Sequence, residues 1–330
     1  MTFEPLPEVQ EISRETFLNE IVPTGQPVVM RGAVNHWASV AKSADTEALC
    51  DYIRAGAGPN DVSVMRAKPS VGGRFFYADN MRQFNFEQGR LSFGTFIDHL
   101  RAGANGDALY MGSTPIGESF PGLRGEFDMP LVPEGTEPRI WIGNRTVVST
   151  HHDGSSNIAS VVAGTRTFTL FAPEQVRNLY PGPIEHTMAG PQVSLVDLDA
   201  PDFDKYPRYK DALATARTAD LGPGDAIYMP PLWWHHVRAT SDFNVLVNFW
   251  WHDRPQISRE PMEAFVLSLL SLRQLPEPER EAWRAMFDYF IFQKDGLPLE
   301  HIPDELQGVL GPINPHRAKA IWKFFTDMMR

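Results

Sequence analysis

The stretch SNIASVVAGTRTFTLFAP, residues 156–173, contains two runs of apolar, β-branched and aromatic residues separated by Gly164. Runs of the same kind occur before and after it, in DALYMGS, PRIWIGNRTVVST, DAIYMPP and NVLVNFWWH, and Gly, Pro and Asn separate them. Short strands of this composition, divided by turn residues, are typical of an antiparallel sandwich or barrel. The sequence from about residue 107 to 252 therefore predicts a mainly β fold.

Helical patterns flank this β-rich region. We expect a domain of residues 1–258, in which N-terminal helices and strands precede the β region, and a C-terminal helical region of residues 259–330. The helix candidates 261–275, 279–294 and 317–329 are rich in Leu, Phe, Trp and Met. They carry more apolar surface than one-sided packing needs. They either cover the barrel or form a homodimer interface in part, and we favour the homodimer.

Composition limits the possible classes of protein. The 330 residues include 42% apolar and 22% charged residues, as in an ordinary globular protein. The net charge of −11 argues against a grip on phosphate backbones, so we expect no nucleic-acid partner. Cys50 is the single cysteine and excludes an internal disulfide. The start resembles no signal peptide, and no apolar run would span a membrane, which predicts a cytoplasmic protein without a membrane partner.

The stretch STHHDGSSN places two histidines and an aspartate side by side. If it ends a strand that begins near residue 139, alternation puts His151 and Asp153 on one face and His152 on the other. Two histidines and a carboxylate on one face are the ligands of non-haem Fe(II) oxygenases, which leave further positions open. A zinc enzyme could use the same ligands. The stretch therefore supplies two of three ligands for a metal site.

The third ligand is expected from WWHHV, where His235 and His236 begin another strand. Two prolines, Pro230 and Pro231, precede it and mark a loop or edge because they lack amide donors. Alternation cannot choose between the two histidines, since the facing of that strand is not known from the sequence. The choice stays open at this level.

Longer segments carry a resemblance. THHDGSSNIASVVAGTRTFTLFAPEQVRNLYPGP, QVSLVDLDAPDFDKYP and LGPGDAIYMPPLWWHHVRATSDFNVLVNFWW together resemble the cupin-like JmjC hydroxylases. The match runs over roughly residues 10–255, and the member most resembled is the asparaginyl hydroxylase that inhibits the hypoxia-inducible factor. The resemblance implies a jelly-roll double-stranded β-helix, and Fe(II), 2-oxoglutarate and O2 as cofactor and co-substrates.

The resemblance also implies roles for residues. The metal ligands, which are also the catalytic residues, would be His151, Asp153 and His235, because the family's ligand directly follows the tryptophan pair. The far carboxylate of 2-oxoglutarate would bind Arg166, where relatives carry lysine; an arginine can pair a carboxylate bidentately. Tyr110 would assist it.

Three more positions complete the implied pocket. Asn157 and Asn248 match amides that line it and are expected to contact the co-substrate. Val148 stands where the asparaginyl hydroxylase has a threonine, so that hydrogen bond is expected to be missing. His152 and His236 are expected to lie outside the ligand set.

These points predict a 2-oxoglutarate-dependent dioxygenase that hydroxylates a C–H bond, most simply in a protein or peptide side chain, with a small molecule as the other substrate class. Two alternatives stay open. One is a non-oxidative metal-dependent cupin, an isomerase or hydrolase, and the other is a binding module with a degenerate site. The long polar connection of residues 172–220 is expected to shape the substrate groove.

Overall fold

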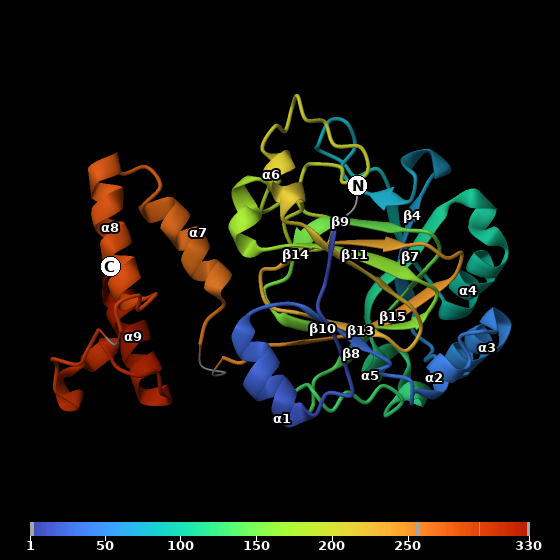
Figure 1. Cartoon of the computed structure of the whole chain (residues 1–330), viewed down its shortest axis with the longest axis horizontal. Helices are drawn as coiled ribbons and strands as arrows, with labels where there is room; N and C mark the ends of the chain where they lie inside the picture. The colour runs from blue at the N-terminus through green and yellow to red at the C-terminus, as the bar shows by residue number, and fades with distance from the viewer. Residues whose placement is uncertain (1–2, 255–257, 297, 329–330) are drawn as a thin grey trace. The chain divides into compact units, whose positions relative to one another are not determined.

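The computed structural model describes residues 3–254, 258–296 and 298–328. They form two compact units, divided in the chain between His252 and Asp253. The first unit contains two β-sheets surrounded by helices and loops, and the second contains helices (Figure 1). This confirms the predicted mainly β fold with flanking helices.

The smaller sheet carries two of the expected metal ligands. Its strands in spatial order are β1 (Glu4–Pro5), β12 (Arg217–Leu221), β11 (Arg166–Phe171), β14 (Trp234–Ala239), β9 (Val147–His152) and β5 (Arg74–Phe75). β11, β12, β14 and β9 pair antiparallel, as the turn residues between the runs predict.

The larger sheet covers the other side of the barrel. Its strands in spatial order are β2 (Glu8–Gln10), β3 (Val28–Arg31), β13 (Ala226–Met229), β10 (Ser156–Ala163), β15 (Asn244–Trp251), β8 (Pro138–Gly143), β7 (Ala108–Pro115), β4 (Val62–Ala67) and β6 (Glu87–Leu91). Every residue of β10 is buried, because this strand lies in the middle of the sheet with a core on each face. Ile158 and Val162 belong to the core under the N-terminal helices, whereas Ala159 and Val161 belong to the core between the sheets.

The fold departs from the predictions at the edges. β1 with β12, β2 with β3 and β5 with β9 pair in parallel, so the fold is not purely antiparallel. β5 ends at Phe75, although the strand-like composition of RFFYAD continues to residue 79. The next amide, of Phe76, donates to the side chain of Asn85 at 2.8 Å, so a side chain replaces the ladder there.

Helices of the first unit pack on the outer face of the larger sheet. They are α1 (Arg14–Thr16), which continues as a π-helix over Phe17–Ile21, α2 (Ala38–Ala41), α3 (Thr46–Gly56), α4 (Phe93–Arg101) and α5 (Ile116–Ser119). Asp45 begins α3 by accepting hydrogen bonds from two backbone amides, and Ser92 begins α4 by accepting one from the amide of Thr95. Their apolar faces, including Leu49 and Phe96, are fully buried in the core on this side.

The long connection after β11 covers the outer face of the smaller sheet. It includes a 3-10 helix at Pro173–Arg177 and α6 (Tyr209–Ala214). Phe171, Trp234 and Tyr209 join the strands to this segment in a separate buried cluster. The connection contains only two short helices, so packing on the sheet is what holds it in place.

The second unit contains α7 (Pro261–Ser271), α8 (Glu277–Phe290) and α9 (Pro315–Met328); position 329 of the predicted third helix lies outside the described residues. None of these helices has a buried residue. The exposed large apolar side chains of the unit are Met262, Phe265, Val266, Leu267, Leu270, Trp283, Met286, Tyr289, Ile291, Phe292, Leu306, Val309, Leu310, Ile313, Trp322, Phe324 and Met328. Within the described part of the chain, no helix has the length and hydropathy of a membrane span.

Phe17 is a strong test of the core under the N-terminal helices. Its ring is fully buried and meets the edge of Tyr228 with 5.1 Å between ring centres. We expect Phe17→Ala to lower the free energy of unfolding by about 3–5 kcal/mol, because the cavity cannot collapse inside a packed core. Chemical denaturation measures this loss.

The neighbouring Leu18 provides the matched control, since it lies in the same helix with 38% of its surface exposed. Leu18→Ala should cost less than about 1 kcal/mol. Equal losses for the two variants would contradict the observed burial.

Candidate metal centre

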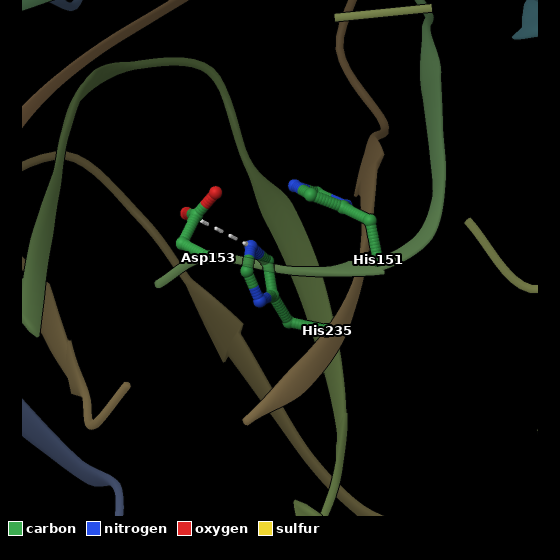
Figure 2. Close-up of side chains that lie close together, drawn as sticks. All are labelled: His151, Asp153 and His235. Carbon is green, nitrogen blue, oxygen red and sulfur yellow. Dashed lines mark ion pairs between the residues drawn. The ribbon is translucent and has the colours of Figure 1, made fainter. Parts of the chain in front are cut away.

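Three side chains converge where β9 and β14 meet. His151 lies near the end of β9, Asp153 follows the strand, and His235 lies near the start of β14. Their ligand atoms all lie within 4.8 Å of one another, and His235 Nε2 is 3.7 Å from Asp153 Oδ2 (Figure 2). The structure therefore brings together the three residues expected to bind a metal.

Backbone carbonyls set the tautomers of both histidines. His151 Nδ1–H donates to the carbonyl of Ser149 at 2.9 Å, and His235 Nδ1–H donates to the carbonyl of Trp233 at 3.0 Å. A carbonyl can only accept, so the proton lies on Nδ1 in each ring. The lone pair of each Nε2 is thereby left for a metal ion, which is the usual arrangement of metal-binding imidazoles.

A chain of hydrogen bonds orients the carboxylate. Trp141 Nε1 donates to Asn248 Oδ1 at 2.7 Å, and Asn248 Nδ2 donates to Asn157 Oδ1 at 3.1 Å. Asn157 Nδ2 then lies 3.4 Å from Asp153 Oδ2, which also accepts from Trp250 Nε1 at 3.1 Å. Asp153 Oδ2 is thus held by two donors, and the carboxylate is fixed towards the histidines.

Burial keeps His235 ready to bind a metal. Its side chain is 4% exposed, and burial together with the neighbouring His151 lowers the pKa of His235 to about 4. Only the neutral form of imidazole offers a lone pair to a metal. His235 is therefore neutral throughout the physiological pH range.

The second histidine of each pair lies outside the cluster. His152 faces away from His151, and its ring packs edge-on against Trp234 with 4.6 Å between centres. His236 is buried beside Thr150, whose Oγ1 is 3.4 Å from its Nδ1. Burial, followed by the charge of Arg74, lowers the pKa of His236 to about 4.

A cavity of about 160 Å³ extends from the three side chains into the barrel. Tyr110, Arg166, Asn157 and Asn248 line it, so the four predicted co-substrate residues share one cavity with the cluster. Val148 also lines the cavity. The asparaginyl hydroxylase has a threonine at this position, and its hydrogen bond was expected to be missing here. Part of its wall comes from Met188, Ala189, Pro191 and Val193 of the long connection.

Arg166 brings a positive charge into this cavity. It is 3% exposed, and its Nε and Nη2 atoms have no hydrogen-bond partner in the described part of the chain. Burial lowers the pKa of Arg166 and the adjacent Tyr110 phenol raises it. Arginine nevertheless stays protonated at neutral pH because its reference value is so high. A buried charge of this kind is costly unless an anion pairs with it.

Sequence reasoning missed Trp141 and Trp250 at this site. Their indole rings meet edge to face with 5.8 Å between centres, and both donate to polar groups of the cavity. One signal was present, because Asn248 and Trp250 are two residues apart on one strand and so share a face. Trp141 gave no such signal, since its strand reads as ordinary core.

Residues 13–257 match the family model described as the cupin-like domain, which is most of the chain. The chain belongs to the cupin-like domain family. The jelly-roll architecture predicted from the resemblance is therefore shown.

Curated relatives of this cupin-like chain carry several names. It is 26% identical over 256 residues to lysine-specific demethylase 8 of Xenopus tropicalis, covering 74% of this chain and 52% of that protein. It is 27% identical over 257 residues to lysine-specific demethylase JMJ30 of Arabidopsis thaliana, covering 75% and 54%. It is 25% identical over 274 residues to tRNA wybutosine-synthesizing protein 5 of Mus musculus, covering 76% and 79%.

These relatives support a JmjC-type cupin without favouring the asparaginyl hydroxylase that the sequence most resembled. The cupin-like chain spans about half the length of the two demethylases. The family and fold are thus shown, and the reaction is a separate question.

The pKa values of His235 and His236 predict that the metal-free protein, prepared with EDTA, loses stability as the pH falls. Both rings stay neutral in the folded state to about pH 4, whereas in the unfolded chain they take up protons below about pH 6.5. The unfolded state binds more protons in this window, so stability is lost as the pH falls from about 6.5 to about 4. Denaturant titrations at several pH values measure this slope.

His236→Gln should reduce that pH dependence, because it removes one of the two groups. The exposed His99→Gln is the control and should leave the slope unchanged. Stability that does not change over this window would contradict the assignment.

Proposed function

We propose that this protein is an Fe(II)- and 2-oxoglutarate-dependent oxygenase that hydroxylates a C–H bond. The observation that carries the proposal is the pairing, in one cavity, of a His-Asp-His cluster with the uncompensated charge of Arg166. A two-histidine, one-carboxylate set suits a redox-active iron, and the buried guanidinium suits the carboxylate of a keto acid. Membership of the cupin-like family and the JmjC-type relatives support this class.

Each group in the cavity has a role under this proposal. Iron, when bound, supplies the oxidising chemistry with O2 and 2-oxoglutarate. His151 and His235 present their Nε2 atoms, and Asp153 presents a carboxylate held by Trp250 and Asn157. Arg166 and Tyr110, which line the same cavity, bind the far carboxylate of 2-oxoglutarate.

Asn157 and Asn248 act on this site by orienting Asp153 and by presenting their amides to the cavity. Apolar side chains such as Phe168, Val237 and Leu246 line the rest of the space and exclude water from the reacting groups.

The substrate that we propose is a protein or peptide side chain. The net charge of −11 disfavours a nucleic acid. Two relatives are named lysine demethylases and one is named for tRNA wybutosine synthesis, so the relatives include both macromolecule classes. A cytoplasmic location remains a prediction from the single cysteine.

Asp153→Ala tests the proposed reaction. We expect more than about a 100-fold loss of 2-oxoglutarate conversion to succinate, because loss of a partner outside the ligand set alone costs 10–100-fold. The assay uses anaerobically purified, iron-loaded protein with and without O2, and circular dichroism confirms the fold. The exposed Asp242→Ala is the control. Full turnover by Asp153→Ala, or none by the wild type, would refute the reaction.

Arg166 tests the co-substrate site. Arg166→Met removes the charge and the fork, so the dissociation constant for 2-oxoglutarate should rise by about 30-fold or more, as for other buried charge pairs. Arg166→Lys keeps the charge and should retain part of the affinity. Thermal-shift titration with 2-oxoglutarate and Mn²⁺ measures both.

Arg217→Met, on the neighbouring strand β12 and half-buried, is the control for Arg166. A non-oxidative cupin makes the opposite prediction to the oxygenase. It would bind zinc or manganese, and neither the wild type nor Arg166→Met would respond to 2-oxoglutarate.

We also propose that the second unit forms a homodimer. Large apolar side chains are exposed along residues 258–296 and 298–328, and monomeric proteins rarely show large apolar patches to water. A second copy offers the same surface, and a two-fold axis lets each face cover the other.

Leu270, 82% exposed on α7, tests the dimer. Leu270→Glu should shift the protein towards monomer in light scattering at micromolar concentration, because the carboxylate would be buried without a partner. Glu281→Lys, a charge change on α8, should leave the mass unchanged. A wild-type protein that is monomeric at high concentration would contradict the proposal.

A further inference from the structure

Arg139 is a cation on the inner face of the barrel that the proposed function does not use. It lies on β8 directly opposite Asn248 of β15, and Asn248 lies opposite Ala159 of β10. Residues opposite each other in a sheet point to the same face. Asn248 and Ala159 line the cavity, so Arg139 extends the same row of side chains by one strand.

Ser113 fixes the guanidinium in place. Arg139 Nε donates to Ser113 Oγ at 2.7 Å, and Arg139 Nη2 donates to the Ser113 carbonyl at 2.7 Å. Ser113 lies at an irregularity in the pairing of β7 with β8, and its φ of +49° is in the left-handed region. Such bulges turn side chains towards a site, and backbone strain of this kind gathers at functional sites.

The guanidinium lies close to the candidate metal centre. Its central carbon is 5.9 Å from the centre of the Trp250 ring, and Trp250 Nε1 donates to Asp153 Oδ2 at 3.1 Å. A single indole therefore connects Arg139 to one of the three proposed ligands. A group bound to Arg139 would lie beside the reacting end of the cavity.

Within residues 3–254, Arg139 forms no ion pair with a carboxylate, whereas several other arginines of this unit do. Ser113 occupies the side of the guanidinium formed by Nε and Nη2. The side formed by Nη1 and Nη2 is left, and two parallel N–H groups there match the two oxygens of a carboxylate.

We propose that Arg139 binds a carboxylate of the substrate and so selects an acidic substrate. This proposal rests on the proposed oxygenase function and names its substrate class. One fixed cation suits one carboxylate, whereas a phosphate backbone needs several cations, and the net charge is −11. The carboxylate can belong to an aspartyl or glutamyl residue of a peptide or to a free amino acid.

The experiment compares matched acidic and amide probes. Wild-type protein with Mn²⁺ and 2-oxoglutarate is titrated with a pooled library of nine-residue peptides whose members differ only in Asp or Glu against Asn or Gln. A second panel contains free and N-acetylated aspartate, glutamate, asparagine and glutamine. Fluorescence anisotropy and calorimetry report binding, and mass spectrometry after iron loading reports an added oxygen atom.

We expect acidic members to bind at least about tenfold more tightly than their amide counterparts, as charge-assisted, bidentate pairs do. Arg139→Gln should abolish this preference and raise KM for the acidic substrate. Arg139→Lys should keep part of it. Arg145→Gln, which changes an exposed arginine beyond the other end of β8, should change nothing. The panel that shows the preference identifies whether the carboxylate comes from a peptide or a free amino acid.

Affinity for Mn²⁺ and 2-oxoglutarate separates the possible failures. If the wild type binds both but shows no acidic preference, binds no acidic probe, or prefers a single-stranded RNA oligonucleotide, the proposal for Arg139 is wrong and the oxygenase function stands. If Arg139→Gln keeps the preference or weakens only Mn²⁺ affinity, Arg139 serves to position Trp250 and the proposal is also wrong. If the wild type fails to bind 2-oxoglutarate, the function itself is wrong.

Discussion

The pairing of β14 with β9 is the constraint on which the site depends. In this register His235 lies opposite His151, and the next aligned pair, after an irregularity, is Val237 with Val148. Side chains alternate between the faces of a strand, so a shift by one residue would turn His236 towards the cavity instead. The register is held because Val237 and Phe168 are needed in the core between the sheets, while Trp234 is needed in the cluster outside.

The cavity combines polar groups that have hydrogen-bond partners with polar groups that lack them. The Asp153 carboxylate is held by a completed chain of amide and indole donors, and each histidine is held by a carbonyl of its own strand. Arg166 lacks partners for two of its nitrogen atoms in the described structure. Rigid groups on one side and an uncompensated charge on the other are what a preorganised site for an anionic co-substrate requires. Under the proposal made above, Arg139 would serve the substrate in the same way, with the nitrogen atoms that Ser113 does not occupy.

Much of the fold could be predicted because buried strands and helices have characteristic patterns of apolar residues in the sequence. β10 is fully buried, β15 is almost fully buried, and both consist mostly of apolar residues, while the caps of α3 and α4 are local sequence features. The parallel edge pairs and the early end of β5 could not be predicted. They depend on partners distant in the chain and, at Phe76, on a single side chain of Asn85 that replaces the ladder.

The sequence by itself determined that His151 and Asp153 share a face, because alternation along one strand is a local property. A family resemblance was needed to choose His235, and the structure shows the physical reason in the register between two strands. Only the tertiary structure brought Arg166 of β11, Trp141 and Arg139 of β8, and Trp250 of β15 around the cluster, since the distances between these three strands depend on how the sheets pack. Two of the three expected ligands, His151 and Asp153, were therefore determined by local alternation, whereas His235 and the surrounding charge and hydrogen bonds depend on how distant strands pair.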